Sequence, residues 1–196
     1  MCQRRAFYAE IARMLRTTKT AAPPRRAEIG EYPMLIRIAG IAPESIVDGP
    51  GFRFTVFTQG CFHDCPGCHN PETHDPDGGR AVTVESLVDA MRKNALLDGL
   101  TLSGGEPFEQ VDACVRLAAE ARGMGLNVWA YSGYTFEELA TDPEKMRLLT
   151  ACDVLVDGPF TLNERTLEKR FRGSRNQRVI NVRKSLERGE IVLEEP

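Results

Sequence analysis

Apolar positions along this chain form two patterns, short continuous runs and longer stretches with helical spacing. The runs at 52–59, 99–105 and 126–133 are short and rich in apolar or β-branched residues, as buried strands are. Between the first two, "TVESLVDAMRKNA" (83–95) repeats apolar residues at the spacing of a helix with one buried face. Strands separated by such helices predict right-handed crossovers and a parallel sheet.

The helical stretches also carry residues that are typical of helix ends. We expect the helix at 83–95 to begin at a Thr83 cap. Its buried face should hold Leu87, Val88, Met91 and Ala95. A second helix is expected over 108–125, with glycines at its end. Its inward residues should be Phe108, Val111, Val115 and Ala118.

The second half of the chain continues the same alternation. Thr135 and Glu138 are placed to form a capping box, in which each side chain accepts from the other residue's free backbone amide. A helix over 142–151 should begin at Asp142, with Pro143 in its first turn. Further strands are expected at 152–158, 178–182 and 190–195.

Residues 1–33 differ from the rest of the chain. Helical spacing at 5–16 is followed by Pro23 and Pro24, and the dense apolar pattern begins only at Met34. We therefore interpret 1–33 as a poorly ordered N-terminal extension and 34–196 as one domain. The alternatives are a basic targeting or partner-binding helix, or a start site that truly lies at Met34.

Composition and charge exclude several classes of protein. The chain has 196 residues, 42% of them hydrophobic, which suits one globular domain. No apolar run reaches the roughly 18 residues of a membrane span and no secretory leader is evident, so we expect a soluble, cytoplasmic protein without a membrane partner. Residues 1–33 carry seven basic and three acidic side chains, which leaves a net charge of −7 on the remainder. An acidic body argues against nucleic-acid binding.

Three of the six cysteines lie in one short segment. Cys61, Cys65 and Cys68 have C-x3-C-x2-C spacing, and such clustering indicates a metal site rather than a disulfide framework. Structural zinc would need a fourth ligand, for which His63 and His69 are candidates. Three thiols without an obvious fourth ligand favour an iron–sulfur cluster with one open iron. The third interpretation of the three cysteines is a redox thiol site.

Two glycine-containing segments share a predicted location with the cysteines. "SGGEP" (103–107) and "YSGYT" (131–135) each follow a predicted strand, as the cysteine segment does. The carboxyl ends of parallel strands meet at one edge, which is where α/β sheets and barrels bind ligands. The three segments are therefore expected to build one site.

Together these segments resemble the radical S-adenosylmethionine (SAM) superfamily. In that family the three cysteines hold a 4Fe–4S cluster, SAM chelates its fourth iron, and a GGE motif on the neighbouring strand meets the SAM amino group. The resemblance implies that Cys61, Cys65 and Cys68 are the cluster ligands. It also implies SAM contacts at Gly67, Cys68, His69, Gly104, Gly105, Glu106 and Ser132.

Three of those positions have alternative roles. His69 could donate to a sulfur or to backbone instead, Glu106 could only cap the following helix, and Ser132 could stabilise a turn. Among the other residues, Asp48 is expected to fix a glycine turn, while Asp157 has either a functional or a turn role. The segment Arg172–Gln177 could serve a partner, SAM or the fold. Cys114 and Trp129 are expected in the core.

Further motifs narrow the resemblance. "VDGPGFRFTVFTQGC" is similar to the glycyl-radical-enzyme activases, which include the pyruvate formate-lyase type. "AYSGYTFEEL", "CDVLVDGPF" and "FRGSRNQRVI" resemble the activating proteins of anaerobic (class III) ribonucleoside-triphosphate reductase. The match runs from about Leu35 to Val182. It departs from the family at "NERTLEKRF", where several relatives carry an aspartate, and this departure leaves partner contacts open.

The resemblance implies a fold and an activity. The expected fold is α/β, a partial parallel β/α barrel of the radical SAM type, since a full barrel takes about 250 residues. An external one-electron donor, such as a flavodoxin or ferredoxin, would reduce the cluster, and reductive cleavage of SAM would give a 5′-deoxyadenosyl radical. That radical would generate a glycyl radical on the large subunit of the reductase, with no catalytic side chain beyond the cluster and SAM. The alternatives are an activase for another glycyl radical enzyme, another small radical SAM enzyme such as a deazaguanine synthase, or a zinc-binding module.

Overall fold

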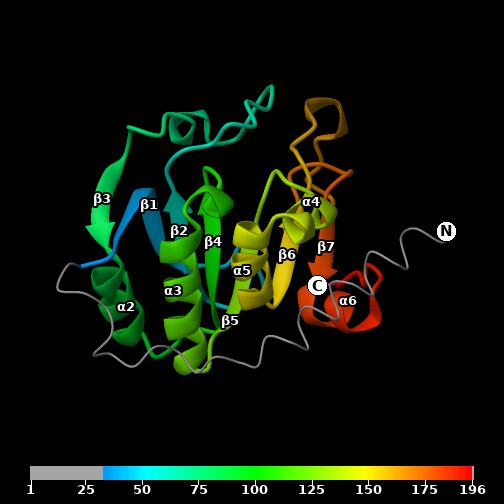
Figure 1. The fold of residues 1–196 in the computed structure, drawn as a ribbon. Coiled ribbons are helices and arrows are strands. Elements are labelled where there is room, and N and C mark those ends of the chain that lie inside the picture. Colours follow the sequence, from blue (N-terminus) through cyan, green and yellow to red (C-terminus); the bar gives the residue numbers. More distant parts are fainter. Residues whose placement is uncertain (1–32, 196) are drawn as a thin grey trace.

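Residues 33–195, the part of the chain that the computed structural model describes, fold around a seven-stranded mixed sheet (Figure 1). Its strand order is β3-β1-β2-β4-β5-β6-β7. In chain order the strands are β1 Leu35–Ser45, β2 Arg53–Thr58, β3 Arg80–Thr83, β4 Gly99–Gly104, β5 Asn127–Tyr131, β6 Val154–Asp157 and β7 Arg178–Asn181. The extension predicted over 1–33 lies outside the described residues, except for Pro33.

The middle of the sheet is parallel and its edges are antiparallel. β2, β4, β5 and β6 run parallel to one another, which confirms the α/β prediction. β1 pairs antiparallel with both β2 and β3, and β7 pairs antiparallel with β6, so a wholly parallel sheet was a wrong expectation. The physical reason is clearest at β1. Only residues 46–52 join it to β2, and a parallel crossover needs a dozen residues or more.

The helices mostly match their sequence patterns. They are α2 Val84–Arg92, α3 Val111–Gly123, α4 Phe136–Thr141, α5 Pro143–Ala151 and α6 Val182–Arg188. Thr83 caps α2 by accepting from Ser86 N, and the Thr135–Glu138 capping box and the Asp142 cap are also present. No helix in the described part of the chain has the length and hydrophobicity of a membrane span.

Three local expectations were wrong. Ala95 is exposed, because α2 ends at Arg92, and Leu97 takes the buried place instead. The stretch at 190–195 forms only an isolated bridge, between Leu193 and Ile180, rather than a strand. Helix α6 was missed, although Asn181 caps its start and left-handed Gly189 (φ 68°) ends it.

Alternation along the strands divides the sheet into two unlike faces. On one face α2, α3 and α5 cover an apolar core that includes Leu100, Leu102 and Leu155 (Figure 1). Successive strand residues point to opposite faces, so the neighbours of these residues face away from the helices. Cys114 lies in the helix-covered core as expected. Trp129 is buried too, but in a small separate cluster on the second face.

Candidate functional site

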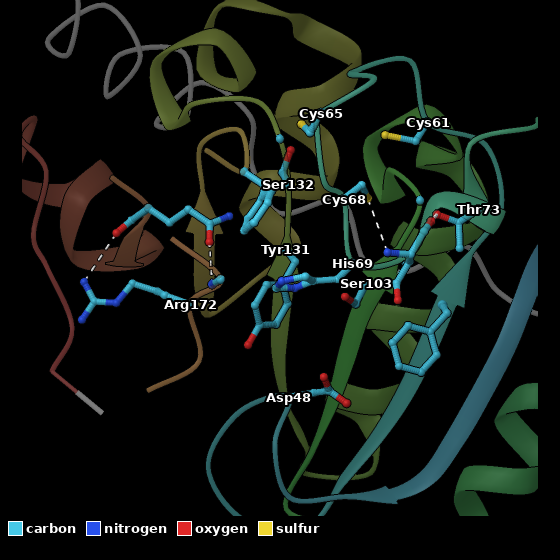
Figure 2. A pocket seen from close by; sticks show the side chains of 18 of the residues that line it. Asp48, Cys61, Cys65, Cys68, His69, Thr73, Ser103, Tyr131, Ser132 and Arg172 are labelled. Atoms are coloured by element: carbon cyan, nitrogen blue, oxygen red, sulfur yellow. Dashed lines mark hydrogen bonds between the residues drawn. The ribbon is translucent and has the colours of Figure 1, made fainter. Parts of the chain in front are cut away.

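A cavity of about 710 Å³ lies along the second face of the sheet and reaches the carboxyl ends of its parallel strands. The expectation that three segments build one site is met, since residues of the cysteine segment, of 103–105 and of 131–133 all line it. In Figure 2 the three cysteines stand toward one end of this cavity, and Asp48 stands toward the other. The cavity therefore has a sulfur-rich end and a more distant polar end.

Backbone hydrogen bonds fix the loop that carries the cysteines. After β2, Gly60 N donates to Thr73 O at 2.8 Å and Cys61 N donates to His74 O at 3.1 Å, so the start of the loop is paired with its return. Cys68 N donates to Cys65 O at 3.0 Å, which closes a tight turn. That turn brings the second and third thiols to the same side of the loop.

The three loop thiols are half-buried and line the cavity, whereas Cys114 and Cys152 are fully buried away from it. Burial raises the pKa of Cys61 to about 11, and the nearby negative charge of Glu106 adds to this effect. Within residues 33–195 no three His, Cys, Asp or Glu side chains converge closely enough to hold a single metal ion. A cluster several atoms wide does not require its ligands to converge on one point, so three thiols around one cavity suit it in donor chemistry.

The two histidines considered as zinc ligands have other contacts. His63 Nε2 lies 2.9 Å from Glu106 Oε2, and this hydrogen bond raises the pKa of the imidazole despite its partial burial. His69 is exposed and packs on Phe160, with ring centroids 4.7 Å apart. His69 and Cys68 both line the cavity, and their contact with SAM stays a prediction. Gly67 itself is not among the lining residues, and its positive φ of 72° serves the turn.

The two glycines of "SGGEP" line the cavity in a crowded backbone. An added Cβ at Gly104 would come within 2.6 Å of Phe57 Cα, and its φ of 95° already favours glycine. An added Cβ at Gly105 would collide with the carbonyl oxygen of Gly60. That oxygen accepts from Glu106 N at 2.8 Å. Glycine is therefore needed at both positions because the end of β4 lies so close to the end of β2 and to the start of the cysteine loop.

Glu106 and Ser132 lie side by side but are exposed to the cavity differently. Ser132 lines it, while Glu106 is 1% exposed and does not. Ser132 Oγ donates to the Glu106 carboxylate at 3.0 Å and accepts from Tyr134 N at 3.0 Å, a turn-stabilising role. Glu106 also accepts from Phe108 N, which is the capping role considered for it. Ser132 therefore combines a place in the cavity wall with a structural role, whereas Glu106 makes structural contacts behind that wall.

Three further residues line the cavity, and none of them had an individual role predicted from the sequence, although Tyr131 and Arg172 lie in segments that were singled out there. Tyr131 faces the middle of the cavity, and burial, together with the negative charge of Asp48, raises its pKa. His74 Nε2 and Arg172 Nε are buried nitrogens without a hydrogen-bond partner among the described residues, and both side chains line the cavity. Alternation in "LNVWAYSG" places Tyr131 on the same face as Trp129, a signal that the sequence did contain.

The remaining residues of uncertain role have structural partners. Asp48 accepts from Ser45 Oγ, in keeping with a turn role, and also lines the cavity. Asp157 accepts from Phe136 N at 2.7 Å and pairs with Arg178, so it anchors the start of α4. In the segment Arg172–Gln177, Gln177 Oε1 accepts from the backbone amides of residues 173 and 174, which folds that segment into a turn beside the cavity.

Comparisons with known proteins show the family of this chain. A family model described as a 4Fe-4S single cluster domain matches residues 47–180. The anaerobic ribonucleoside-triphosphate reductase-activating protein of Escherichia coli (strain K12) is 34% identical over 152 residues, which cover 72% of this chain and 96% of that protein. The protein of the same name from Enterobacteria phage T4 is 35% identical over 147 residues, 71% of this chain and 90% of its own length.

One solved structure gives a weaker likeness. QueE from Escherichia coli aligns with 52% of this chain and 54% of its own, at 18% identity and a TM-score of 0.43, and no argument rests on it. The family model and the curated relatives agree independently over most of the chain. The chain therefore belongs to the 4Fe-4S single cluster domain family and to the family of anaerobic ribonucleoside-triphosphate reductase-activating proteins.

Proposed function

We propose that this protein is a radical SAM enzyme that activates an anaerobic ribonucleoside-triphosphate reductase. One observation carries the proposal. Three half-buried thiols from one loop share a cavity with the glycine-rich ends of β4 and β5, in a chain whose relatives have this activity in their name. Its relatives are matched over 90% or more of their own length in the two cases described, so the region that carries their function is present.

Cys61, Cys65 and Cys68, which line the cavity, would hold the 4Fe–4S cluster. When bound, the cluster would take one electron from an external donor and supply it for the reductive cleavage of SAM, the chemistry by which a glycyl radical would be generated on the reductase. A flavodoxin or ferredoxin is the donor class we propose. All other contributions come from the side chains and backbone of this chain.

The lining of the cavity suits the mixed polarity of SAM. Its sulfur-rich end continues into the backbone of residues 103–105 and the hydroxyl of Ser132, which supply polar groups for the amino acid part of SAM. Tyr131 and Phe57 offer aromatic walls farther along. The unpartnered nitrogens of His74 and Arg172 are donors or acceptors that a ligand can satisfy. The sheet has two edge strands, β3 and β7, so it is open rather than a closed barrel. That it is an incomplete barrel of the radical SAM type stays a prediction.

The rim of the cavity offers a surface for the reductase. Leu167 and Val47 line the cavity while remaining 92% and 72% exposed, and exposed apolar side chains beside a cavity can contact a partner. Leu167 belongs to the long connection between β6 and β7, which also carries the departure from the family pattern at "NERTLEKRF". We propose that this rim contacts the polypeptide segment that brings the glycine to the cavity.

The test is reconstitution with iron and sulfide in the absence of oxygen, followed by addition of SAM and a chemical reductant. We expect about four irons and four sulfides per chain and the release of 5′-deoxyadenosine and methionine in equal amounts. A colourless protein that takes up only zinc, or a cluster that never cleaves SAM, would refute the proposal. Offering pyruvate formate-lyase in place of the reductase tests the second candidate, an activase for that enzyme.

A further inference from the structure

The carboxylate of Glu106 is completely occupied by hydrogen bonds from its own protein. It is 1% exposed and follows the two glycines at the end of β4. Oε1 accepts from Phe108 N at 3.1 Å, and Oε2 accepts from Gly133 N at 2.9 Å. Ser132 Oγ donates to both oxygens, at 3.1 and 3.0 Å. His63 Nε2 lies 2.9 Å from Oε2, and because a carboxylate only accepts, that nitrogen is the donor.

These donors come from three different segments of the chain. Phe108 belongs to the 3-10 turn η2 (Pro107–Glu109) that follows Glu106, and residues 132 and 133 form the turn after β5. His63 lies in the cysteine loop, two positions after Cys61 and two before Cys65. A carboxylate offers about four lone-pair sites, so this set of donors leaves none for a bound ligand. The residue that the SAM motif assigns to the ammonium group is instead a junction between loops.

Packing also fixes the imidazole that completes the junction. The ring of Tyr134 meets the His63 ring edge-on, with centroids 4.4 Å apart and planes at 70°. Tyr134 is held in turn by its hydroxyl, which donates to Glu109 Oε1 at 2.6 Å. Gly133 leaves room for the imidazole, since an added Cβ there would collide with the ring. The His63 side chain is 18% exposed, so solvent competes little for its hydrogen bond.

We infer that His63 and Glu106 form a latch that positions the cysteine loop against the turn after β5, and that Glu106 is a positioning residue rather than a ligand of SAM. Because His63 lies between Cys61 and Cys65, the latch would hold this part of the cysteine loop beside Ser132, and all four of these residues line the same cavity. The latch itself rests on the geometry of the chain alone. Its consequence for SAM rests on the proposed function.

The first arm of the test uses the metal-free protein, with hydrogen exchange of backbone amides as the readout. His63→Leu and Glu106→Gln should each speed exchange about tenfold, in 60–69 and in 132–135 alike, since a lost hydrogen bond to a buried carboxylate changes a local opening equilibrium by that order. The strand amides of β4 should stay protected. Asp64→Asn is the matched control, because that side chain is in the same loop but 98% exposed. Unchanged exchange at 132–135 in His63→Leu would overturn the latch.

The second arm uses the reconstituted protein and the paramagnetic resonance spectrum of its reduced cluster, recorded with and without SAM. His63→Leu should keep the cluster but weaken the SAM-induced spectral change about tenfold in SAM concentration. His63→Gln should restore it, because its amide nitrogen can donate from the place of Nε2. The double variant His63→Leu with Glu106→Gln should need no more SAM for the spectral change than Glu106→Gln alone.

Two results distinguish the latch from a direct SAM-binding role of Glu106 and from a failure of the proposed function. If Glu106→Gln abolishes the SAM-induced change while exchange in both loops stays at the wild-type rate, Glu106 is a direct SAM ligand and the latch is refuted. If the wild-type spectrum does not respond to SAM at all, the proposed function fails, and the exchange arm still decides whether the latch exists.

Discussion

The two faces of the sheet use the same strands for different purposes. On the helix-covered face, residues such as Phe54, Val56 and Leu102 are at most 1% exposed and pack on other apolar side chains. On the opposite face the intervening positions include Arg53 and Thr101, which are equally buried but hydrogen-bonded. The first face packs in an ordinary apolar core, whereas the second face has buried polar side chains and lines the cavity.

Arg53 illustrates how the second face is stabilised. Its guanidinium donates to Leu100 O at 2.7 Å, to Asn127 Oδ1 at 2.9 Å and to Pro50 O at 3.2 Å. It also lies over the Trp129 ring, 5.4 Å from the centroid. Burial lowers its pKa to about 10, so it remains charged at neutral pH. The difference between the faces teaches that burial alone does not mark the core of this protein.

Loss of a cysteine should have its largest effect on the cavity side, at the cysteine loop, and little effect in the helix-covered core. Cys65→Ala should abolish iron uptake and SAM cleavage, because a cluster with two protein ligands and an open iron is not held. The measurement is iron and sulfide content after anaerobic reconstitution, with 5′-deoxyadenosine release as the activity. An active cluster in Cys65→Ala would show that the loop is not the ligand set.

The second effect should appear only in the presence of the reductase. Leu167→Asp places a charge on the apolar rim, so activation of the reductase should fall more than tenfold, as for the loss of about 2 kcal/mol at an interface. SAM cleavage without the partner should stay near wild type. Leu96→Asp is the control, since Leu96 is 69% exposed just before the amino end of β4. Equal loss in both variants would argue against a docking role for the rim.

The third effect compares a glycine at the site with one outside it. Gly105→Ala should lower the free energy of unfolding by about 1–3 kcal/mol, because its Cβ overlaps a backbone carbonyl that cannot move freely. Gly123→Ala at the end of α3 meets nothing within 4 Å and should be neutral or stabilising by up to about 1 kcal/mol. Denaturant unfolding of both metal-free variants checks this. A Gly105→Ala variant as stable as wild type would contradict the described approach of β4 to the cysteine loop.

The smallest effect belongs to the helix-covered face. Cys114→Ala removes a fully buried sulfur from the core and should cost about 1 kcal/mol, as does the loss of one methylene-sized group. Iron content and SAM cleavage should not change, because this thiol does not line the cavity. Loss of iron in this variant would mean that Cys114 belongs to the ligand set after all.

The sequence predicted the helix-covered face better than the cavity face. Apolar spacing and caps such as Thr83 and Asp142 are local signals, and they placed the central strands and most helices. The antiparallel pairings of β3 with β1 and of β7 with β6 join segments far apart in the chain, for which spacing gives no signal. In the site, the cysteines and glycines could be found from their motifs. The roles of His63 and Glu106 could not, because their contact joins residues 43 positions apart.

Activation of an anaerobic ribonucleoside-triphosphate reductase by this chain should leave a glycyl radical on the reductase. The most direct measurement mixes the reconstituted protein with the large reductase subunit, SAM and a one-electron donor, and records the paramagnetic resonance spectrum. We expect a radical doublet on the reductase that collapses to a single line when its glycines are deuterated at Cα. SAM cleavage without any radical on the reductase, or a radical only on pyruvate formate-lyase, would contradict the claim.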